Sequence, residues 1–144
     1  MKKIKAFLIA GLLVFCVSTP VLADSPRIWS RKISVTLPRW GGQVTPTAWV
    51  TKVSWDEKAS FYFTYAKQWL KANAYVYCQT DIPLWYGVQA SEGEILYTDA
   101  FNTEVYPPYI KWYSYAKSNS LEPNETKLEY YFSPDIKTTI PPKN

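Results

Sequence analysis

Apolar or aromatic side chains alternate with polar ones along several short stretches of this chain, and this period of two constrains the fold most. Ile33, Val35 and Leu37 alternate with polar neighbours in one such stretch. Successive side chains of a β-strand point to opposite faces, so the pattern predicts strands with one buried face. The same alternation recurs farther along the chain, at 47–55, 61–65, 74–79, 110–115 and 127–132.

Turn-forming residues separate these stretches at the spacing of β-hairpins. Gly41-Gly42 lies in a predicted turn over 39–46, and Asp56-Glu57-Lys58 makes another. With two shorter stretches at 84–89 and 94–97, the pattern predicts an all-β fold. We expect an antiparallel β-sandwich of about eight short strands.

Two segments depart from this regularity. Residues 66–74 fit either a strand or a short helix, because Phe61, Tyr65 and Trp69 also recur at helical spacing and no Gly or Pro interrupts them. The tail at 134–144 is rich in proline, so we expect it to be irregular and unpaired.

The first 23 residues predict a secretory signal peptide that is removed from the mature chain. Lys2, Lys3 and Lys5 form a positive start, and residues 6–17 are an unbroken run of apolar and small side chains. That run is too short for a bilayer core, which needs about 20 residues, but it suits the apolar region of a signal peptide. With cleavage after Ala23, we expect an extracellular bacterial protein with one domain over 24–144 and no later membrane-spanning segment.

Charge is nearly balanced once the signal peptide is set aside. Of 16 Lys+Arg, three lie in the first five residues, which leaves 13 against 12 Asp+Glu and a net charge of +1. Binding to duplex DNA needs several cations on one face, so we expect no nucleic-acid partner. Arg27, Arg31, Lys32 and Arg39 gather near the new N-terminus. They are either a solvated start to the domain or a weak attraction for anionic envelope polymers.

Few residue types for catalysis or metal binding are available. Cys78 is the one cysteine after residue 23, and the chain has no histidine, so a cysteine nucleophile lacks its usual base. Alternation places Cys78 on the same face as Val76, and we expect a small buried side chain there. Zinc would need a ligand set that the sequence lacks, and we expect no metal and no cofactor.

Paired carboxylates are the remaining route to an enzyme. Asp56/Glu57 and Glu92/Glu94 could serve glycoside hydrolysis if they were held at the right separation. Both pairs fall in predicted tight turns, where exposed acids are ordinary, and Gly93 separates the second pair. We therefore predict that the protein is not an enzyme.

Aromatic residues are the most promising binding groups. Of the 121 residues after the predicted cleavage site, 23 are aromatic, and several strands carry rings on both faces. A sandwich buries one face of each sheet, so some rings must lie outside, either as cross-strand packing or as a binding surface. The candidate ligand-binding residues are Trp40, Trp85, Tyr86, Tyr106, Tyr109, Trp112 and Tyr113.

Short stretches are similar to small secreted proteins of Gram-positive bacteria. In this chain Thr51-Lys52-Val53-Ser54-Trp55 leads to the aromatic Ala59-Ser60-Phe61-Tyr62-Phe63. Lys58-Ala59-Ser60-Phe61-Tyr62 resembles the aromatic close of bacteriocins of the lactococcin 972 type. The ending Tyr130-Tyr131-Phe132-Ser133-Pro134-Asp135 is similar to that of uncharacterised secreted proteins associated with such systems. The resemblance implies a small β-sandwich that acts at the cell envelope without enzymatic chemistry.

Two functions follow as hypotheses. The first is a secreted, bacteriocin-like protein that engages the envelope of a neighbouring cell through its aromatic faces. The second is a secreted binding module for a glycan or a protein partner. A tyrosine-rich edge strand could pair two copies, and the sequence leaves the oligomeric state open.

Overall fold

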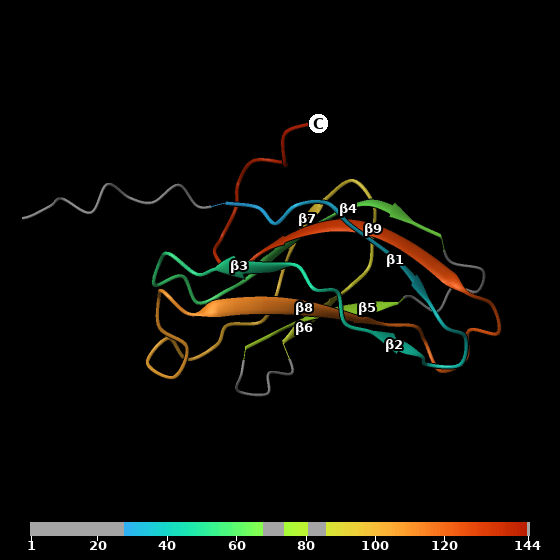
Figure 1. The fold of residues 1–144 in the computed structure, drawn as a ribbon. Coiled ribbons are helices and arrows are strands. Elements are labelled where there is room, and N and C mark those ends of the chain that lie inside the picture. Colours follow the sequence, from blue (N-terminus) through green and yellow to red (C-terminus); the bar gives the residue numbers. More distant parts are fainter. Residues whose placement is uncertain (1–27, 68–73, 81–85, 144) are drawn as a thin grey trace, which may run out of the picture.

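The described part of the chain is made of β-strands and contains no helix. The computed structural model describes residues 28–67, 74–80 and 86–143, and Figure 1 shows their arrangement. No helix in these ranges could cross a membrane. The strands are β1 (Ile33–Leu37), β2 (Gln43–Val44), β3 (Trp49–Thr51), β4 (Ser60–Ala66), β5 (Tyr75–Gln79), β6 (Gly87–Gln89), β7 (Ile95–Tyr97), β8 (Lys111–Lys117) and β9 (Thr126–Ser133).

These strands form two antiparallel sheets. Sheet A has the order β1-β9-β4-β7, and sheet B has the order β2-β8-β5-β6, with β3 also pairing with β8. Figure 1 shows the sheets as two layers, with β4 and β9 in one and β8, β5 and β6 in the other. The all-β, antiparallel prediction is confirmed. The described strands number nine rather than about eight, because the two-residue strand β2 lies inside the stretch predicted as a turn.

Several predictions concern segments outside the described residues. The signal peptide at 1–23 is one of them, and most of the ambiguous stretch at 66–74 is another. The turn at Asp81-Ile82-Pro83 and the first residues of the predicted strand 84–89 also lie there.

The core fills the space between the sheets with the inward side chains that alternation predicts. Phe61 and Phe63 of β4 are fully buried, and so is Tyr130 of β9. The ring centroids of Phe63 and Tyr130 are 5.6 Å apart. Tyr130 also joins the two sheets, because its hydroxyl lies 2.9 Å from Ser114 Oγ on β8. The phenol is thereby satisfied inside an apolar interior.

One strand breaks the predicted alternation. The sequence predicts Phe61, Phe63 and Tyr65 on one face, but Tyr65 is exposed. The register of β4 against β9 shifts between Phe63 and Tyr65, so β4 carries one extra residue there. A β-bulge of this kind re-aims the side chains that follow it, and this sends Tyr65 to the outer side.

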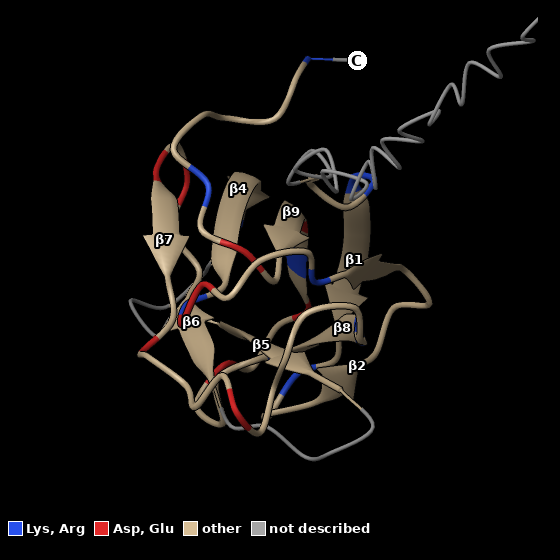
Figure 2. Ribbon diagram, turned by 90° about the vertical axis from the view of Figure 1, so that its left-hand side faces the viewer, with Lys and Arg blue, Asp and Glu red and all other residues tan. Residues whose placement is uncertain are grey.

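Charged side chains are interspersed around the described part of the fold. Figure 2 shows basic and acidic positions on several strands and connections rather than on a single side. One ion pair on the outer face of sheet A joins Lys32 Nζ to Glu129 Oε2 at 2.6 Å, and Lys127 lies 3.4 Å from the same carboxylate. Both lysine side chains are about half exposed, at 46% and 52%.

Candidate functional site

The outer face of sheet B carries a group of exposed rings around a lysine. In the β3–β8 register Trp49 lies opposite Tyr113, and Thr51 lies opposite Lys111. Tyr109 lies just before β8 with a left-handed φ of 70°, and its backbone N–H donates to the carbonyl oxygen of Lys52, the residue after β3, at 2.7 Å. We call Trp49, Tyr109, Lys111 and Tyr113 the aromatic patch.

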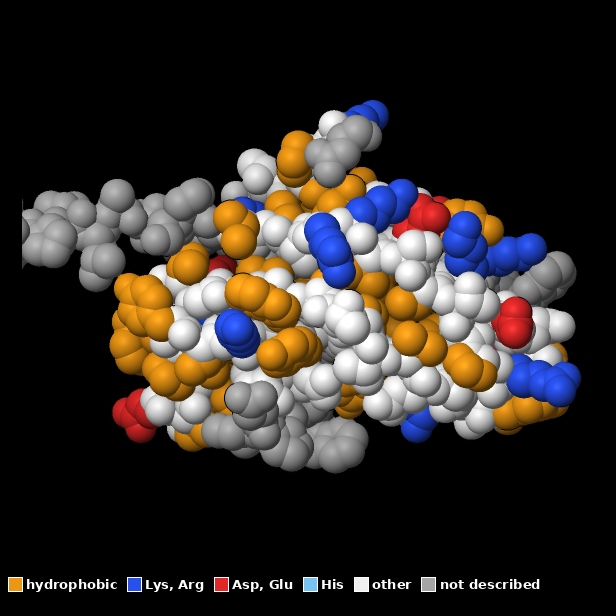
Figure 3. Space-filling model, in the orientation of Figure 1, with side chains coloured by type: hydrophobic (Ala, Val, Ile, Leu, Met, Phe, Trp, Pro, Cys, Tyr) orange, Lys and Arg blue, Asp and Glu red, His pale blue; other side chains and the backbone are white. Residues whose placement is uncertain are grey.

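Exposure makes the aromatic patch available to a ligand. Trp49 is 50% exposed and Tyr109 is 65% exposed. Lys111 is exposed and Tyr113 is half-buried. Figure 3 shows hydrophobic side chains gathered toward the end of the molecule where β3 and the start of β8 lie, with a basic side chain among them.

A cation–π contact orders the centre of this patch. Lys111 Nζ lies 4.3 Å from the centroid of the Trp49 ring. A contact of this kind at an exposed site contributes about 0.5–1 kcal/mol. It holds the ammonium over the indole ring, while half of the tryptophan surface remains exposed.

A stacked row of tyrosines adjoins the patch on the same face. Tyr77 of β5 lies opposite Tyr115 of β8, with ring centroids 4.8 Å apart and an interplanar angle of 12°. Tyr75 extends the row at 6.1 Å from Tyr77. Burial raises the pKa of Tyr77 and of Tyr115. The row packs ring against ring, which stiffens the sheet beside the patch.

Gly87 of β6 makes room for this row. A Cβ atom at that position would meet Tyr77 Cδ1 at 2.4 Å, closer than real side chains approach. The absence of a side chain at Gly87 therefore lets the Tyr77 ring lie against the neighbouring strand.

The structure separates the predicted ligand-binding residues into distinct places. Tyr109 and Tyr113 belong to the aromatic patch. Trp40 is 60% exposed but precedes β2, at the opposite end of the molecule from the turn that follows β3 (Figure 1). Its φ of 60° is a left-handed conformation, and the tight turn continues at Gly41 with φ 77°. Trp85 lies outside the described residues.

The other three predicted residues pack inward. Trp112 is fully buried. Tyr86 and Tyr106 are partly buried and make edge-on contacts with Phe101, at 5.7 and 6.2 Å between ring centroids. These rings therefore contribute to the core. Trp49 and Lys111 were not among the predicted residues. Alternation places Trp49 and Val50 on opposite faces, and the structure shows that the face of Val50 is the inward one.

A second cluster, absent from the predicted site, lies buried between the sheets at the end of β3. Lys52 and Asp135 are both fully buried, and Lys52 Nζ lies 3.3 Å from Asp135 Oδ1. The ammonium also donates to the backbone carbonyl oxygens of Asp56 at 2.7 Å and of Pro134 at 2.8 Å. No strand forms at 134–143, yet the start of this segment is part of the interior, where the sequence predicts an unpaired tail.

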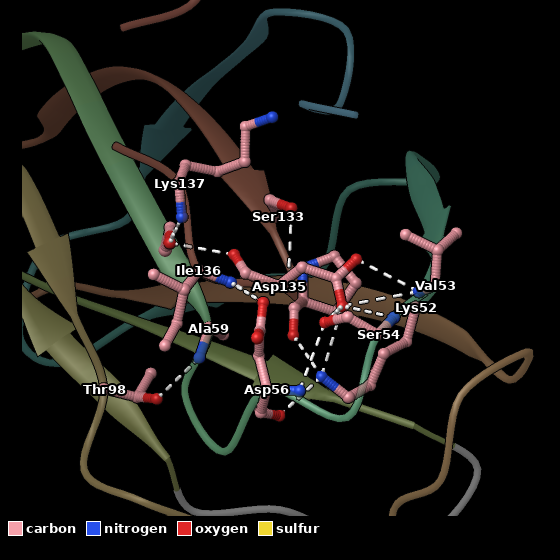
Figure 4. Close-up of polar contacts among 12 residues, drawn as sticks. Lys52, Val53, Ser54, Asp56, Ala59, Thr98, Ser133, Asp135, Ile136 and Lys137 are labelled. Carbon is pink, nitrogen blue, oxygen red and sulfur yellow. Dashed lines mark hydrogen bonds and ion pairs between the residues drawn. The ribbon is translucent and has the colours of Figure 1, made fainter. Parts of the chain in front are cut away.

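Asp135 accepts further hydrogen bonds from the chain just after β3, as Figure 4 shows. Oδ1 accepts from the backbone N–H of Ser54 at 3.0 Å and from Ser54 Oγ at 2.7 Å. Oδ2 accepts from the backbone N–H of Val53 at 3.1 Å. Around the pair, Ser60 Oγ donates to the carbonyl oxygen of Asp135 at 2.9 Å. The cluster thus ties the end of β3 to the segment that follows β9.

Aromatic and apolar side chains surround the lysine. Nζ lies 5.1 Å from the ring centroid of Phe101 and 5.9 Å from that of Trp112. Burial lowers the pKa of Lys52, and the Asp135 carboxylate opposes this shift. Burial also raises the pKa of the nearby Cys78 thiol to about 12. The fully buried Lys52 and Asp135 are closed to an external substrate, so their chemistry is confined to each other.

The signal for Lys52 was present in the sequence. Alternation places Lys52 on the same face as Ala48 and Val50, both of which are buried. A lysine in register with an inward apolar face implies a buried partner. Asp135 gave no comparable signal, because it follows the last strand in a segment without periodicity.

One carboxylate of each pair considered for catalysis accepts a hydrogen bond from a backbone N–H. Asp56 Oδ2 accepts from the backbone N–H of Ile136 at 2.8 Å. Glu92 Oε1 accepts from the backbone N–H of Ala66. Within the ranges that the structure describes, His, Cys, Asp and Glu side chains form no group of three or more that could hold a metal ion.

Comparisons with known proteins identify no relative. No family model, curated protein or solved structure matches this chain.

Proposed function

We propose that this protein is secreted and acts without catalysis at the bacterial cell envelope, where the aromatic patch binds a glycan. The observation that carries the proposal is the cross-strand pair of exposed Trp49 and half-buried Tyr113 beside Lys111. Export rests on the signal-peptide pattern of residues 1–23.

The chemistry of the patch suits a sugar. The C–H bonds on one face of a pyranose ring are weakly positive, and the face of an aromatic ring is negative, so the two stack. Tyrosine and tryptophan also offer polar edges that hydrogen-bond to sugar hydroxyls. Lys111 adds a donor and a positive charge, which favours an anionic envelope polysaccharide over a neutral one.

The aromatic patch is held in place by the sheet, which favours a binding site that exists before the ligand binds. Trp49 and Tyr113 sit on hydrogen-bonded strands, and the Tyr77–Tyr115 stack flanks them. Side chains held by a sheet lose little conformational freedom when a ligand binds, so more of the contact energy appears as affinity.

Binding to isolated cell walls tests the proposal. The chain secreted with its own leader is mixed with purified walls, and the bound fraction is measured for wild type and for the double variant Trp49→Ala/Tyr113→Ala. We expect at least a tenfold weaker association for the double variant, because each buried aromatic anchor contributes above about 1 kcal/mol. Trp40→Ala is the control, since that tryptophan is also exposed, at 60% against 50% for Trp49, but lies elsewhere.

Growth of the same cells distinguishes the two forms of the proposal. Growth arrest that requires the patch supports the bacteriocin-like function, and binding without arrest supports a passive module. Equal binding by wild type and the double variant overturns the glycan site.

A further inference from the structure

The buried Lys52–Asp135 cluster joins two distant parts of the chain through reactive groups. The two residues are 83 positions apart in sequence. Lys52 Nζ and Asp135 Oδ1 are 3.3 Å apart, and both residues are fully buried. An amine and a carboxyl group are the two groups that condense to an amide.

The geometry around Lys52 suits a neutral amine aimed at Asp135. A neutral amine has two hydrogens and one lone pair. The carbonyl oxygens of Asp56 and Pro134, at 2.7 and 2.8 Å, accept two hydrogens from Nζ. In the ion pair the third hydrogen of Nζ is donated to Asp135 Oδ1 at 3.3 Å, so transfer of this proton to the carboxylate would leave the nitrogen lone pair on the side that faces Asp135. Positioning of this kind can replace much of the entropy cost of bringing two reactants together.

Donors around Asp135 suit the charge that develops during addition to its carboxyl carbon. Ser54 directs its backbone N–H and its hydroxyl at Oδ1, and Val53 directs its backbone N–H at Oδ2. Preorganised N–H and O–H donors stabilise a tetrahedral oxyanion in a dry site. They are fixed by the turn after β3, so they need no rearrangement during the reaction.

We propose that Lys52 and Asp135 condense to an intramolecular isopeptide bond between Nζ and Cγ. One proton first passes from the ammonium to the carboxylate, which gives a neutral amine and a carboxylic acid. The nitrogen lone pair then forms the C–N bond, and one C–O bond breaks. The oxygen leaves as water with two of the three ammonium protons, and the third remains on the amide nitrogen. No oxidation or reduction occurs.

The surroundings favour the product. Two opposite charges in the interior carry a desolvation penalty, and condensation removes both of them. The pair is fully buried, and exclusion of bulk water disfavours the reverse hydrolysis. The bond would close a loop between β3 and the chain after β9, which restricts the unfolded chain as a disulfide does.

Mass spectrometry of the folded, secreted chain tests the proposal. We expect the intact mass to be lower by one water than the mass calculated for the processed sequence. Trypsin should leave Lys52 uncut and release a branched peptide that joins 40–58 to 128–137. Fragmentation of that peptide should place the link at Lys52 and Asp135.

A matched pair of variants completes the test. Lys52→Arg keeps the positive charge without the reactive amine and should show the full calculated mass. Lys127→Arg changes another lysine that lies over an aromatic ring, outside the aromatic patch, and should keep the loss of one water. A folded wild-type chain with the full mass and separate linear peptides would show a structural ion pair only, and it would overturn the proposal.

Discussion

Two lysines lie over aromatic rings on opposite faces of sheet B, and their surroundings differ. On the outer face, Lys111 covers Trp49 at 4.3 Å, and half of the indole is exposed. On the inner face, Lys52 lies 5.1 Å from the Phe101 ring centroid, and both residues are buried. On this sheet, therefore, the pairing of an ammonium with a ring can be compared in contact with water and away from it.

Burial changes what such a contact does. The outer lysine stays hydrated, so its contact with Trp49 is weak and leaves the ring free to exchange neighbours. The inner lysine has lost its water, and before the proposed condensation its charge is tolerated because Asp135 and two backbone carbonyls replace that water. The inner face therefore stabilises the fold, while the proposed ligand binding belongs to the outer face.

Removal of the inner carboxylate should have the largest effect. Asp135→Ala removes the counter-charge of the buried Lys52 ammonium and also prevents the proposed isopeptide bond, so we expect the free energy of unfolding to fall by at least about 3 kcal/mol. Denaturant unfolding of the purified chain measures this loss. Asp99→Ala removes an exposed acid and should change stability by less than about 0.5 kcal/mol. If both variants lowered the free energy of unfolding by similar small amounts, the Lys52–Asp135 pair would not stabilise the fold as we infer.

The tryptophans of the two faces offer a second contrast. Trp112 is fully buried, and Trp112→Ala should cost about 3–5 kcal/mol through lost packing and a cavity. Trp49 lies on the neighbouring strand but faces outward, so Trp49→Ala should cost at most about 1 kcal/mol. Thermal and denaturant unfolding compare the two. Equal costs would mean that Trp49 also belongs to the packed structure.

Alkaline pH should lower the free energy of unfolding through Cys78, which is buried in the core. Its thiol pKa is raised by burial from 9.0 to about 12, so between these values the unfolded chain loses a proton that the folded chain keeps. The unfolded state then binds fewer protons, and stability falls with rising pH by about 1.4 kcal/mol per pH unit from this group. Unfolding of wild type and Cys78→Ala at several pH values above about 9 measures the difference. Parallel pH profiles would be inconsistent with this prediction.

The smallest effect is expected for the ion pair on the outer face of sheet A. Lys32 and Glu129 are 2.6 Å apart, and the Glu129 pKa is lowered chiefly by its hydrogen bond to Lys32. Water and salt screen this pair, and Lys127 remains beside the carboxylate after Lys32→Ala. Unfolding of Lys32→Ala should match that of wild type within experimental error. A loss comparable to that of Asp135→Ala would remove the distinction between buried and exposed pairs.

The sequence predicts the strands better than it predicts the sites. Strands such as β1 and β9 are readable because their inward residues alternate without interruption, as in Leu128, Tyr130 and Phe132. The predicted inward position of Tyr65 was wrong, because the β-bulge shifts the register and no residue pattern in the sequence indicates it.

The sites depend on contacts between distant residues. Lys52 could be placed on an inward face, but its partner lies 83 positions away in a segment without strand periodicity. Trp112 and Tyr113 were both proposed as binding residues, although adjacent positions of one strand face opposite sides. The pairing of Trp49 with Tyr113 depends on the β3–β8 register, which follows from tertiary packing rather than local pattern.

The most direct test of this division between faces is the affinity of Trp49→Ala for the purified envelope glycan, measured together with its free energy of unfolding. We predict affinity weakened by about thirtyfold, which corresponds to about 2 kcal/mol for a binding hot spot, with stability lowered by at most about 1 kcal/mol. Unchanged affinity would contradict the account, and so would a weakened affinity accompanied by a loss of stability as large as that of Trp112→Ala.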